Sequence, residues 1–296
     1  MHDKHLKTEI SGEEIITSTI FGFLRELIMI KERSDYQAFI VCADSPPYIK
    51  KQRYKTYKEK RGSKAKIPSF AYERDILEAI LYDLRIPVVH ARGFEAEEVA
   101  KVVLKGNAHV ESMDLYSSDE DCYCLLSNKT SLVKSVKGNL EYFMVEDLRY
   151  KYGVTPRQFV SWKCLTGCSS DEVEGINGCG KKYASILVSK FGSLDGIYES
   201  LGEIDKMGKK FSKIASSLRS VKDSGELEKI KFLICMGHPK KLEIKVPEEK
   251  LNFEEILEVI EARTFLKGRP LRFLKNIKKE NPFYLKELRL IPKFNE

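Results

Sequence analysis

Short β-like runs alternate with amphipathic helical stretches in the first half of this chain, and this alternation restricts its fold more than any other feature. The strand-like runs cover residues 36–44, 86–90 and 113–118, and the helix-like stretches cover residues 15–32, 70–84 and 93–104. Strands that alternate with helices predict a parallel sheet covered by helices. We therefore expect an α/β fold with a parallel sheet, followed from residue 145 by a mainly helical second half.

Acidic residues follow each of the three expected strands. The set comprises Asp44, then Glu95, Glu97 and Glu98, then Asp119 and Asp121. Ligands of parallel sheets collect beyond the carboxyl ends of the strands, and Mg²⁺ prefers oxygen ligands. Acids in the first turn of a helix also stabilise the helix dipole, and an aspartate often simply caps a helix. The recurrence after three strands favours a metal site, in which these carboxylates converge on one pocket.

A basic segment lies between the first strand and the next helix. Residues 50–66 contain nine lysines and arginines and one acid, a local charge of +8 in a chain whose net charge is +7. Tyrosines interleave with the basic residues, which suits a surface that tracks and stacks on single-stranded nucleic acid. A solvated charged face and a localisation signal are the alternatives. The candidate contact residues are Lys50, Lys51, Arg53, Tyr54, Lys55 and Tyr57.

The stretch GINGCGKKYA has the form of a helix-hairpin-helix turn. Glycines stand at Gly175, Gly178 and Gly180, and a helix is expected to begin at Lys181, next to Lys182. Glycines let the backbone approach a phosphate closely, and the first N–H groups of a helix bind it. Such contacts position DNA without reading its sequence. An ordinary turn between helices is the alternative.

The seven cysteines and the N-terminal residues bear on the compartment and on zinc. No secretory leader or membrane-spanning stretch is recognisable, so we expect a cytoplasmic protein with reduced thiols and no membrane contact. Cys122-x-Cys124 and the pair Cys164 and Cys168 lack the spacing of ordinary zinc sites. Free thiols are therefore favoured over structural zinc.

Four segments, taken in order, resemble the 5′–3′ exonuclease/flap endonuclease family. They are ADSPPYIKKQRYKTYKEKR, GFEAEEV, YSSDEDCYCLLS and KYGVTPRQFVSWKCLTGCSSDEVEGINGCGKKYA. The family includes phage 5′ nucleases and the 5′-nuclease domain of bacterial DNA polymerase I, and the resemblance covers about residues 15–240. It implies a PIN-like nuclease domain over residues 1–144 with a helical arch at 45–68. A helix-hairpin-helix domain over 145–240 and a helical, basic extension over 241–296 would follow.

The resemblance also implies roles for individual residues. The metal ligands would be Asp44, Glu95, Glu97, Glu98, Asp119, Asp121 and Asp171, holding two Mg²⁺ or Mn²⁺ ions, and a K⁺ ion would lie at the hairpin. Lys58 and Arg61 match basic residues that contact the scissile phosphate.

This sequence departs from the family pattern at three places. Glutamates replace both aspartates of the family's E-x-D-D motif, and Cys168 stands where its G-D-x-x-D motif has the first aspartate. The family's N-terminal strand, which ends in a metal-binding aspartate, is not matched, since Asp3 does not lie in a strand-like context. We expect these losses to reduce the activity.

The expected function is that of a structure-specific 5′ nuclease in DNA replication or repair. Its substrates would be 5′ flaps, 5′ ends or RNA–DNA primers, and it would act as a monomer with a DNA polymerase as a partner. A catalytically weakened or inactive relative that binds branched or 5′-ended DNA is the alternative. A metal-independent RNA-binding module is a more distant one, based on the basic segment alone.

Overall fold

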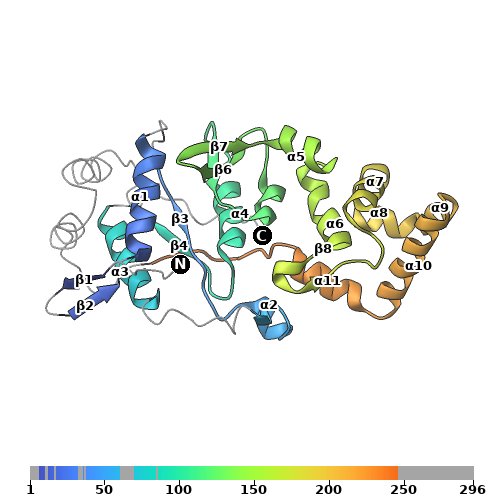
Figure 1. The fold of residues 1–296 in the computed structure, drawn as a ribbon, viewed down its shortest axis with the longest axis horizontal. Coiled ribbons are helices and arrows are strands. Elements are labelled where there is room, and N and C mark those ends of the chain that lie inside the picture. The colour runs from blue at the N-terminus through green and yellow to red at the C-terminus, as the bar shows by residue number, and fades with distance from the viewer. Residues whose placement is uncertain are drawn as a thin grey trace.

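The computed structural model describes residues 7–10, 13–16, 18–32, 36, 38–60, 70–84 and 86–245. The molecule is elongated, with α1 (Ser18–Glu32) and α3 (Phe70–Asp83) towards one end (Figure 1). Two small sheets occupy the middle, and a helical half forms the other end. A separate antiparallel hairpin, β1 (Lys7–Ile10) and β2 (Glu13–Ile16), lies beside α3.

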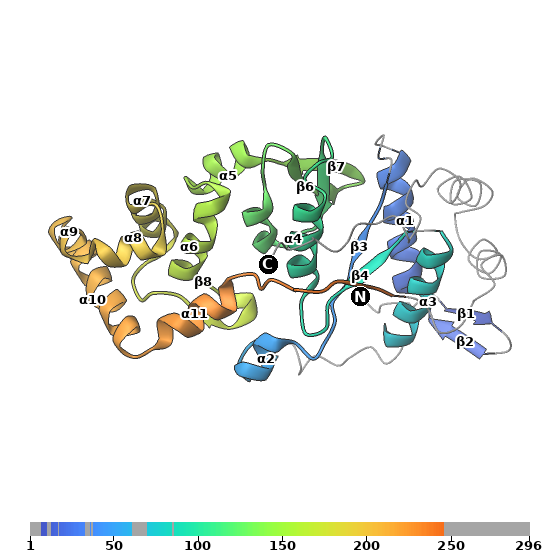
Figure 2. The ribbon, with the colours of Figure 1, turned by 180° about the vertical axis from the view of Figure 1, so that it is seen from behind.

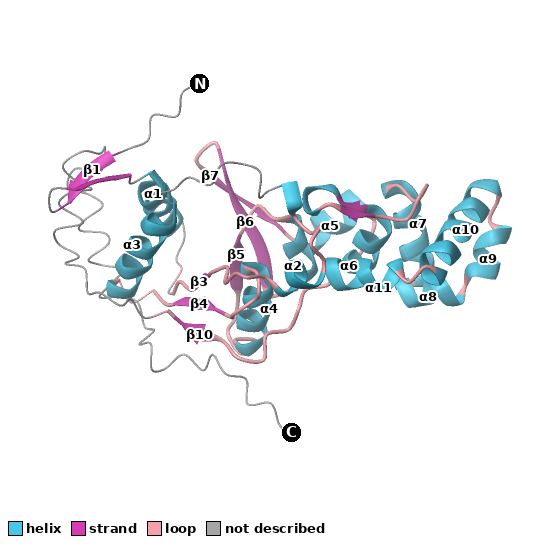
Figure 3. Ribbon diagram, turned by 90° about the horizontal axis from the view of Figure 1, so that it is seen from below, coloured by secondary structure: helices cyan, strands magenta, loops and turns pink. Residues whose placement is uncertain are grey.

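The first sheet has helices on both faces. It contains β3 (Val41–Cys42), β4 (Val88–His90) and β10 (Glu243–Ile244) in the order β10-β4-β3, with β3 parallel and β10 antiparallel to β4. Neighbouring side chains of a strand point to opposite faces. Val88 accordingly packs with α1 and α3, whereas Val89 packs with α4 (Ala96–Gly106), as the separation of these helices in Figure 3 illustrates.

The apolar stripe of α1 explains its packing against α3. Ile20, Leu24, Leu27 and Ile28 recur at the spacing of one helical face and are buried against Ile76, Leu77, Ile80, Leu81 and Leu84. This contact covers one face of the first sheet, where Val88 belongs to the same buried cluster and Val41 and Ala43 pack against it.

The second sheet contains a hairpin that the sequence analysis did not anticipate. Its strands are β5 (Met113–Tyr116), β6 (Thr130–Val136) and β7 (Asn139–Phe143), with β5 parallel and β7 antiparallel to β6. Lys137 and Gly138 form the turn between β6 and β7, with φ of 50° and 78°. Two positive φ angles are the hallmark of the type I′ turn that favours tight hairpins. The expected α/β class is thus confirmed. The pairs β3–β4 and β5–β6 are parallel, and the antiparallel strands β10 and β7 make each of the two sheets mixed.

The helical half packs on the second sheet through one continuous core. Trp162 and Leu165 belong to the same buried cluster as Tyr123 and Leu132. Figure 2 shows the helical half next to β6 and β7. The helices are α5 (Val145–Tyr152), α6 (Pro156–Thr166), α7 (Lys181–Phe191), α8 (Leu194–Glu199), α9 (Leu201–Lys206), α10 (Lys209–Asp223) and α11 (Glu226–Ile234). Between α6 and α7, β8 (Gly167–Cys168) and β9 (Val173–Glu174) pair around the short helix η3 (Ser169–Asp171).

Several expected boundaries differ from the structure. The first helix begins at Ser18, because residues 13–16 pair as β2, and the strand expected over 36–44 is confined to Val41–Cys42. The basic segment contains the short helix α2 (Ile49–Arg53), and residues 61–68 of the expected arch lie outside the described residues. The helical extension expected over 241–296 begins instead with β10, and its residues 246–296 lie outside the described part. None of the helices that the structure describes is long and apolar enough to cross a membrane.

Candidate active site

Acids from three loops lie at the strand ends, as the sequence analysis predicts. Asp44 follows β3, Glu95 is the N-cap of α4, and Asp119 is the N-cap of the short helix η2 (Glu120–Leu125). The Oδ1 atom of Asp44 accepts the N–H of Ala96 at 2.8 Å. This bond ties the loop after β3 to the start of α4, so the first two groups of acids are held together by backbone contacts.

The carboxylates of Glu95 and Glu98 form a buried capping box at the start of α4. Glu95 is 3% exposed and Glu98 is 2% exposed. The N–H of Glu95 donates to Oε2 of Glu98 at 3.0 Å, and the N–H of Gly237 donates to the other oxygen, Oε1, at 2.6 Å. Each Glu98 oxygen therefore has a backbone donor, and the side chain joins α4 to a segment far along the chain.

Two lysines and a tyrosine of the basic segment enter this acidic cluster. Lys50 Nζ lies 3.4 Å from Oε2 of Glu95 and 3.3 Å from Oε1 of Glu98. Lys58 forms an ion pair with Oε1 of Glu95, and the hydroxyl of Tyr57 donates to Oε2 of Glu95 at 2.9 Å. Buried carboxylates are costly without such partners.

This arrangement corrects the expectation that the basic segment is exposed throughout. Lys50 is 7% exposed and Tyr57 is 2% exposed, so neither side chain faces solvent. Lys51, Arg53 and Lys55 are exposed, in line with a surface role. Tyr54 is half-buried against Phe232, with 5.7 Å between the ring centroids, and Arg61 lies outside the described residues.

The ionisation of two glutamates reflects these contacts. Burial by itself would raise the pKa of Glu95, but the charges of Lys58 and Lys50 and the hydrogen bonds from Lys58 and Tyr57 together lower it below its ordinary value. Burial, followed by the negative charge of Glu95 and a smaller contribution from Asp119, raises the pKa of Glu97 to about 7. Glu97 thus stands among like charges, an arrangement that a bound cation would stabilise.

A second group of acids lies between η2 and the β8–β9 hairpin. Asp121 forms an ion pair with Lys163 of α6, and Lys163 Nζ also lies 3.7 Å from the Sγ atom of Cys168. Asp171 is buried, and one of its oxygens lies 3.9 Å from Lys58 Nζ. The Sγ atom of Cys168 is 3.1 Å from the hydroxyl oxygen of Ser170.

Asp121 and Asp171 thus each have a lysine within ion-pair distance. Within the described residues, no group of three or more His, Cys, Asp or Glu side chains is arranged to hold a metal ion. The convergence of the carboxylates on one metal-binding pocket stays a prediction. In this structure several of these carboxylates pair instead with Lys50, Lys58 and Lys163.

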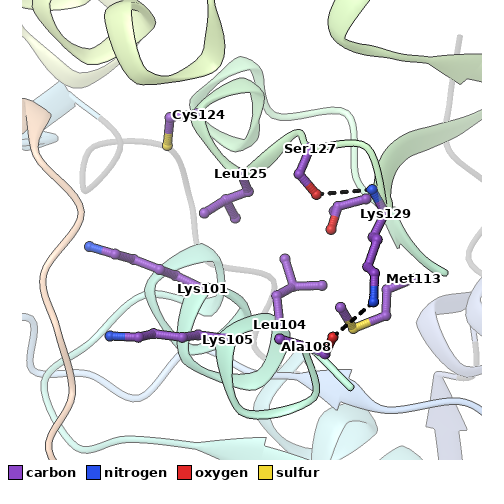
Figure 4. A pocket seen from close by; sticks show the side chains of 10 residues that line it. Lys101, Leu104, Lys105, Ala108, Met113, Cys124, Leu125, Ser127 and Lys129 are labelled. Carbon is purple, nitrogen blue, oxygen red and sulfur yellow. Dashed lines mark hydrogen bonds between the residues drawn. The ribbon is translucent and has the colours of Figure 1, made fainter. Parts of the chain in front are cut away.

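A cavity of about 280 Å³ lies elsewhere, between α4 and the start of β6 (Figure 4). Lys101, Lys105 and Lys129 contribute to its lining, together with apolar side chains such as Leu104 and Leu125. Lys129 Nζ donates to the carbonyl oxygen of Ala108 at 3.1 Å. None of the acids predicted to bind metal lines this cavity, so it is separate from the candidate active site.

The hairpin between α6 and α7 matches its predicted form at two of three glycines. Gly178 is exposed with a φ of 77°, and Gly180 caps α7, where an added Cβ would meet open space. Gly175 differs, because a Cβ there would lie 2.4 Å from the carbonyl carbon of Thr166. Gly175 therefore allows close backbone packing beside β8, and its predicted contact with DNA stays a prediction. Lys181 and Lys182 are exposed, and the first turn of α7 carries no acid.

Sequence reasoning missed three residues near these sites. Lys163 holds Asp121, the backbone of Gly237 holds Glu98, and Lys210 at the start of α10 approaches the hairpin, 3.4 Å from where a Cβ on Gly178 would lie. A signal for Lys210 was available, since Gly208 opens a GKKF run that repeats the GKKY run at Gly180. The sequence feature that could have indicated Lys163 is its position as a single cation among the buried apolar residues of α6.

Comparisons with known proteins agree with this geometry. Two family models match the chain, the 5′-3′ exonuclease N-terminal resolvase-like domain over residues 2–153 and the 5′-3′ exonuclease C-terminal SAM fold over residues 154–254. DNA polymerase I of Bacillus subtilis (strain 168) is 26% identical over 255 residues, which cover 84% of this chain and 28% of the polymerase. A 5′-3′ exonuclease of Aquifex aeolicus (strain VF5) is 31% identical over 186 residues, covering 62% of this chain and 63% of that protein. The chain therefore spans little more than a quarter of the polymerase's length.

Solved structures share the fold. The D15 protein of bacteriophage T5, co-crystallised with metal ions, matches with a TM-score of 0.59 at 20% identity, covering 89% of this chain and 92% of that one. The catalytic core of Rad2 in complex with DNA substrate matches with a TM-score of 0.52 at 18% identity, covering 90% and 87%. The family resemblance of the sequence is thus confirmed. With both of its halves matched in order, the chain belongs to the 5′–3′ exonuclease family.

Proposed function

We propose that this chain is a metal-dependent 5′ nuclease that hydrolyses phosphodiester bonds at 5′ flaps and 5′ ends of DNA. The observation that carries the proposal is the clustering of acids at the N-terminus of α4, with Lys58 beside them, in a member of this family. Acids alone would repel a phosphodiester, so this cluster needs cations to act on DNA.

The donor chemistry around Glu97 fits a hard divalent ion such as Mg²⁺ or Mn²⁺. Glu95, Glu97 and Asp119 offer only oxygen atoms, and burial, followed by the negative charge of Glu95, raises the pKa of Glu97. When bound, the ion would lower the pKa of a water molecule and stabilise charge at phosphorus. Glu98 has a different role in this proposal. Its oxygens accept backbone N–H groups, so it positions α4.

Lys58 is the residue proposed to act on the scissile phosphate. Its ammonium group pairs with Glu95 in this structure. When DNA enters, this group would instead pair with a phosphoryl oxygen. A cation placed there neutralises the charge that grows in the transition state. Arg61 is proposed to assist, as the family pattern implies, and Asp44 keeps the start of α4 in place through Ala96.

The duplex part of the substrate would lie on the hairpin. Gly178 and Gly180 allow backbone approach to a phosphate, and Lys181, Lys182 and Lys210 add positive charge. As the family resemblance implies, a K⁺ ion would also bind at this turn. The exposed cations Lys51, Arg53 and Lys55 would track the single strand.

The biological setting is part of the same proposal. The similarity to DNA polymerase I favours a role in DNA replication or repair, with a polymerase as partner and RNA–DNA primers among the substrates. We also propose that the chain divides into two domains at residue 144 and that it acts as a monomer in the cytoplasm.

The test is cleavage of a labelled 5′-flap substrate by the full chain with Mg²⁺, Mn²⁺ or EDTA. We expect cleavage with either ion, none with EDTA, and a loss of at least a hundredfold in Glu97→Gln, because this change removes an ionic ligand. Absence of cleavage in both ions would refute the proposal.

A second candidate function is binding of branched DNA without cleavage. It is favoured by the lysines that neutralise Glu95 and Asp121 in this structure. Tight flap binding that is independent of EDTA, combined with no cleavage, would establish it.

A further inference from the structure

The described part of the basic segment contacts the helical half at two places. At the end of α2, the guanidinium carbon of Arg53 lies 4.5 Å from the centroid of the Phe232 ring of α11. A cation over the face of an aromatic ring is attracted to it. Further along the segment, the N–H of Lys60 donates to Oε1 of Glu172 at 2.7 Å. The stretch that carries Lys58 is therefore held on both sides.

The contact with Glu172 includes a second hydrogen bond from the same stretch. Glu172 is the C-cap of η3 and directly follows Asp171, whose carbonyl oxygen accepts the N–H of Lys58 at 3.3 Å. The N–H groups of Lys58 and Lys60 thus meet two consecutive residues of the β8–β9 hairpin. Because hydrogen bonds are directional, two of them fix both the position and the direction of the backbone at Lys58.

Both sides of this contact adopt a backbone conformation that is rare for their residue types. Lys58 has a φ of 52° and Glu172 has a φ of 60°. This left-handed conformation is unfavourable for residues other than glycine, and asparagine and aspartate tolerate it better than lysine or glutamate do. Such conformations persist only where surrounding contacts hold them, and they cluster at functional sites. In this conformation the Lys58 side chain forms its ion pair with Glu95.

We propose that Glu172 is the positioning residue of Lys58. Its carboxylate holds the backbone of the basic segment, so that the Lys58 ammonium group lies at the acidic cluster before DNA binds. This inference rests on the proposed nuclease function, in which Lys58 acts on the scissile phosphate. A lysine side chain is long and flexible, so a fixed backbone narrows the positions that its charge can take. Glu172 thus acts on the reaction through Lys58, and its loss affects orientation more than affinity.

The first test is single-turnover cleavage of a labelled 5′-flap substrate by the full chain with Mg²⁺ or Mn²⁺. We expect Glu172→Ala to cut about tenfold more slowly than the wild type, with a change in flap affinity below about twofold. Glu172→Gln should stay within about threefold of the wild-type rate, because its amide oxygen still accepts the N–H of Lys60. Glu174→Ala is the matched control, since Glu174 is an exposed acid of the adjacent strand β9, and it should cut at the wild-type rate.

A double variant separates positioning of Lys58 from general damage to the hairpin. In a chain that already carries Lys58→Ala, Glu172→Ala should have no further effect on the cleavage rate, because the group that it positions is gone. Hydrogen exchange of the metal-free chain without DNA gives a readout that does not depend on cleavage. Backbone amides of residues 57–60 should exchange about threefold or more faster in Glu172→Ala than in the wild type or in Glu172→Gln.

The outcomes distinguish this inference from the nuclease proposal. No cleavage by the wild type with either ion would refute the nuclease proposal, and this inference with it. An active wild type with an equally active Glu172→Ala, an equal loss in the Lys58→Ala background, or unchanged hydrogen exchange would overturn the role of Glu172 alone. Equal losses in Glu172→Gln and Glu172→Ala would do the same. If Glu172→Ala fails to fold, Glu172→Gly serves, since glycine adopts a positive φ without strain, and the same tenfold loss is expected.

Discussion

Replacement of Lys50 by methionine removes the cation that bridges the two buried glutamates of α4. Lys50 Nζ lies 3.4 Å from Glu95 and 3.3 Å from Glu98, and its side chain is 9% exposed. Loss of one partner from a buried ion pair costs about 3–5 kcal/mol. Glu95 keeps Lys58 and Tyr57, and Glu98 keeps its two backbone donors, so we expect a loss below this range, about 2–3 kcal/mol.

The assay is urea unfolding of the metal-free chain, with the melting temperature as a second measure. A loss of this size corresponds to a fall of roughly 5–10 °C for a protein of this length. Added Mn²⁺ should restore more stability to Lys50→Met than to the wild type, because the ion then meets less neutralised carboxylates. Lys51→Met is the control, as its side chain is exposed, and should change the free energy of unfolding by less than about 0.5 kcal/mol. Equal free energies of unfolding for the two variants would refute the idea that Lys50 compensates buried charge.

Three further predictions concern ionisation, catalysis and the hairpin. Because the pKa of Glu97 rises from 4.5 to about 7 on folding, its stabilising effect is complete below pH 4.5 and is lost as pH rises through 7. The metal-free wild type should therefore lose about 1–3 kcal/mol relative to Glu97→Gln between pH 5 and 8, as measured by urea unfolding, and parallel pH profiles would contradict this. Lys58→Ala should slow single-turnover flap cleavage by about a hundredfold while flap affinity changes less than about threefold, and equal losses would make Lys58 a simple phosphate anchor. Gly175→Ala should lower the melting temperature, because its Cβ would lie 2.4 Å from backbone. Gly180→Ala should leave the melting temperature unchanged and weaken binding of duplex DNA. The opposite ranking of the two variants in thermal melts and binding titrations would disprove the assigned roles.

Local sequence patterns predicted those parts of the fold whose causes are local. The apolar spacing of α3 predicted that helix close to its observed limits, and the glycines before α7 predicted its start at Lys181. The turn at Lys137 and Gly138 was equally local, and the alternation of β6 and β7 around it was a readable hairpin signal that went unused. By contrast, β10 pairs with β4 across more than 150 residues, and a two-residue strand carries no pattern of its own.

The candidate site shows the same division. The positions of Asp44, Glu95 and Asp119 after strands followed from the order of elements along the chain. The partners of these acids could not be predicted from that order, because tertiary contacts decide whether a carboxylate meets a lysine or a metal ion. Lys163 reaches Asp121 only when α6 packs beside η2, and no spacing in the sequence encodes that approach.

The contact between Glu98 and Gly237 has a consequence for the order in which the protein folds during synthesis. The two residues are 139 positions apart, and the segment beyond α11 then runs back along α4 to add β10 to β4 (Figures 1 and 2). A ribosome releases the N-terminal half first. Until the segment through Lys245 has emerged, Glu98 lacks one of its donors and β4 keeps an open edge. The N-terminal half therefore completes its fold only after most of the helical half has been made.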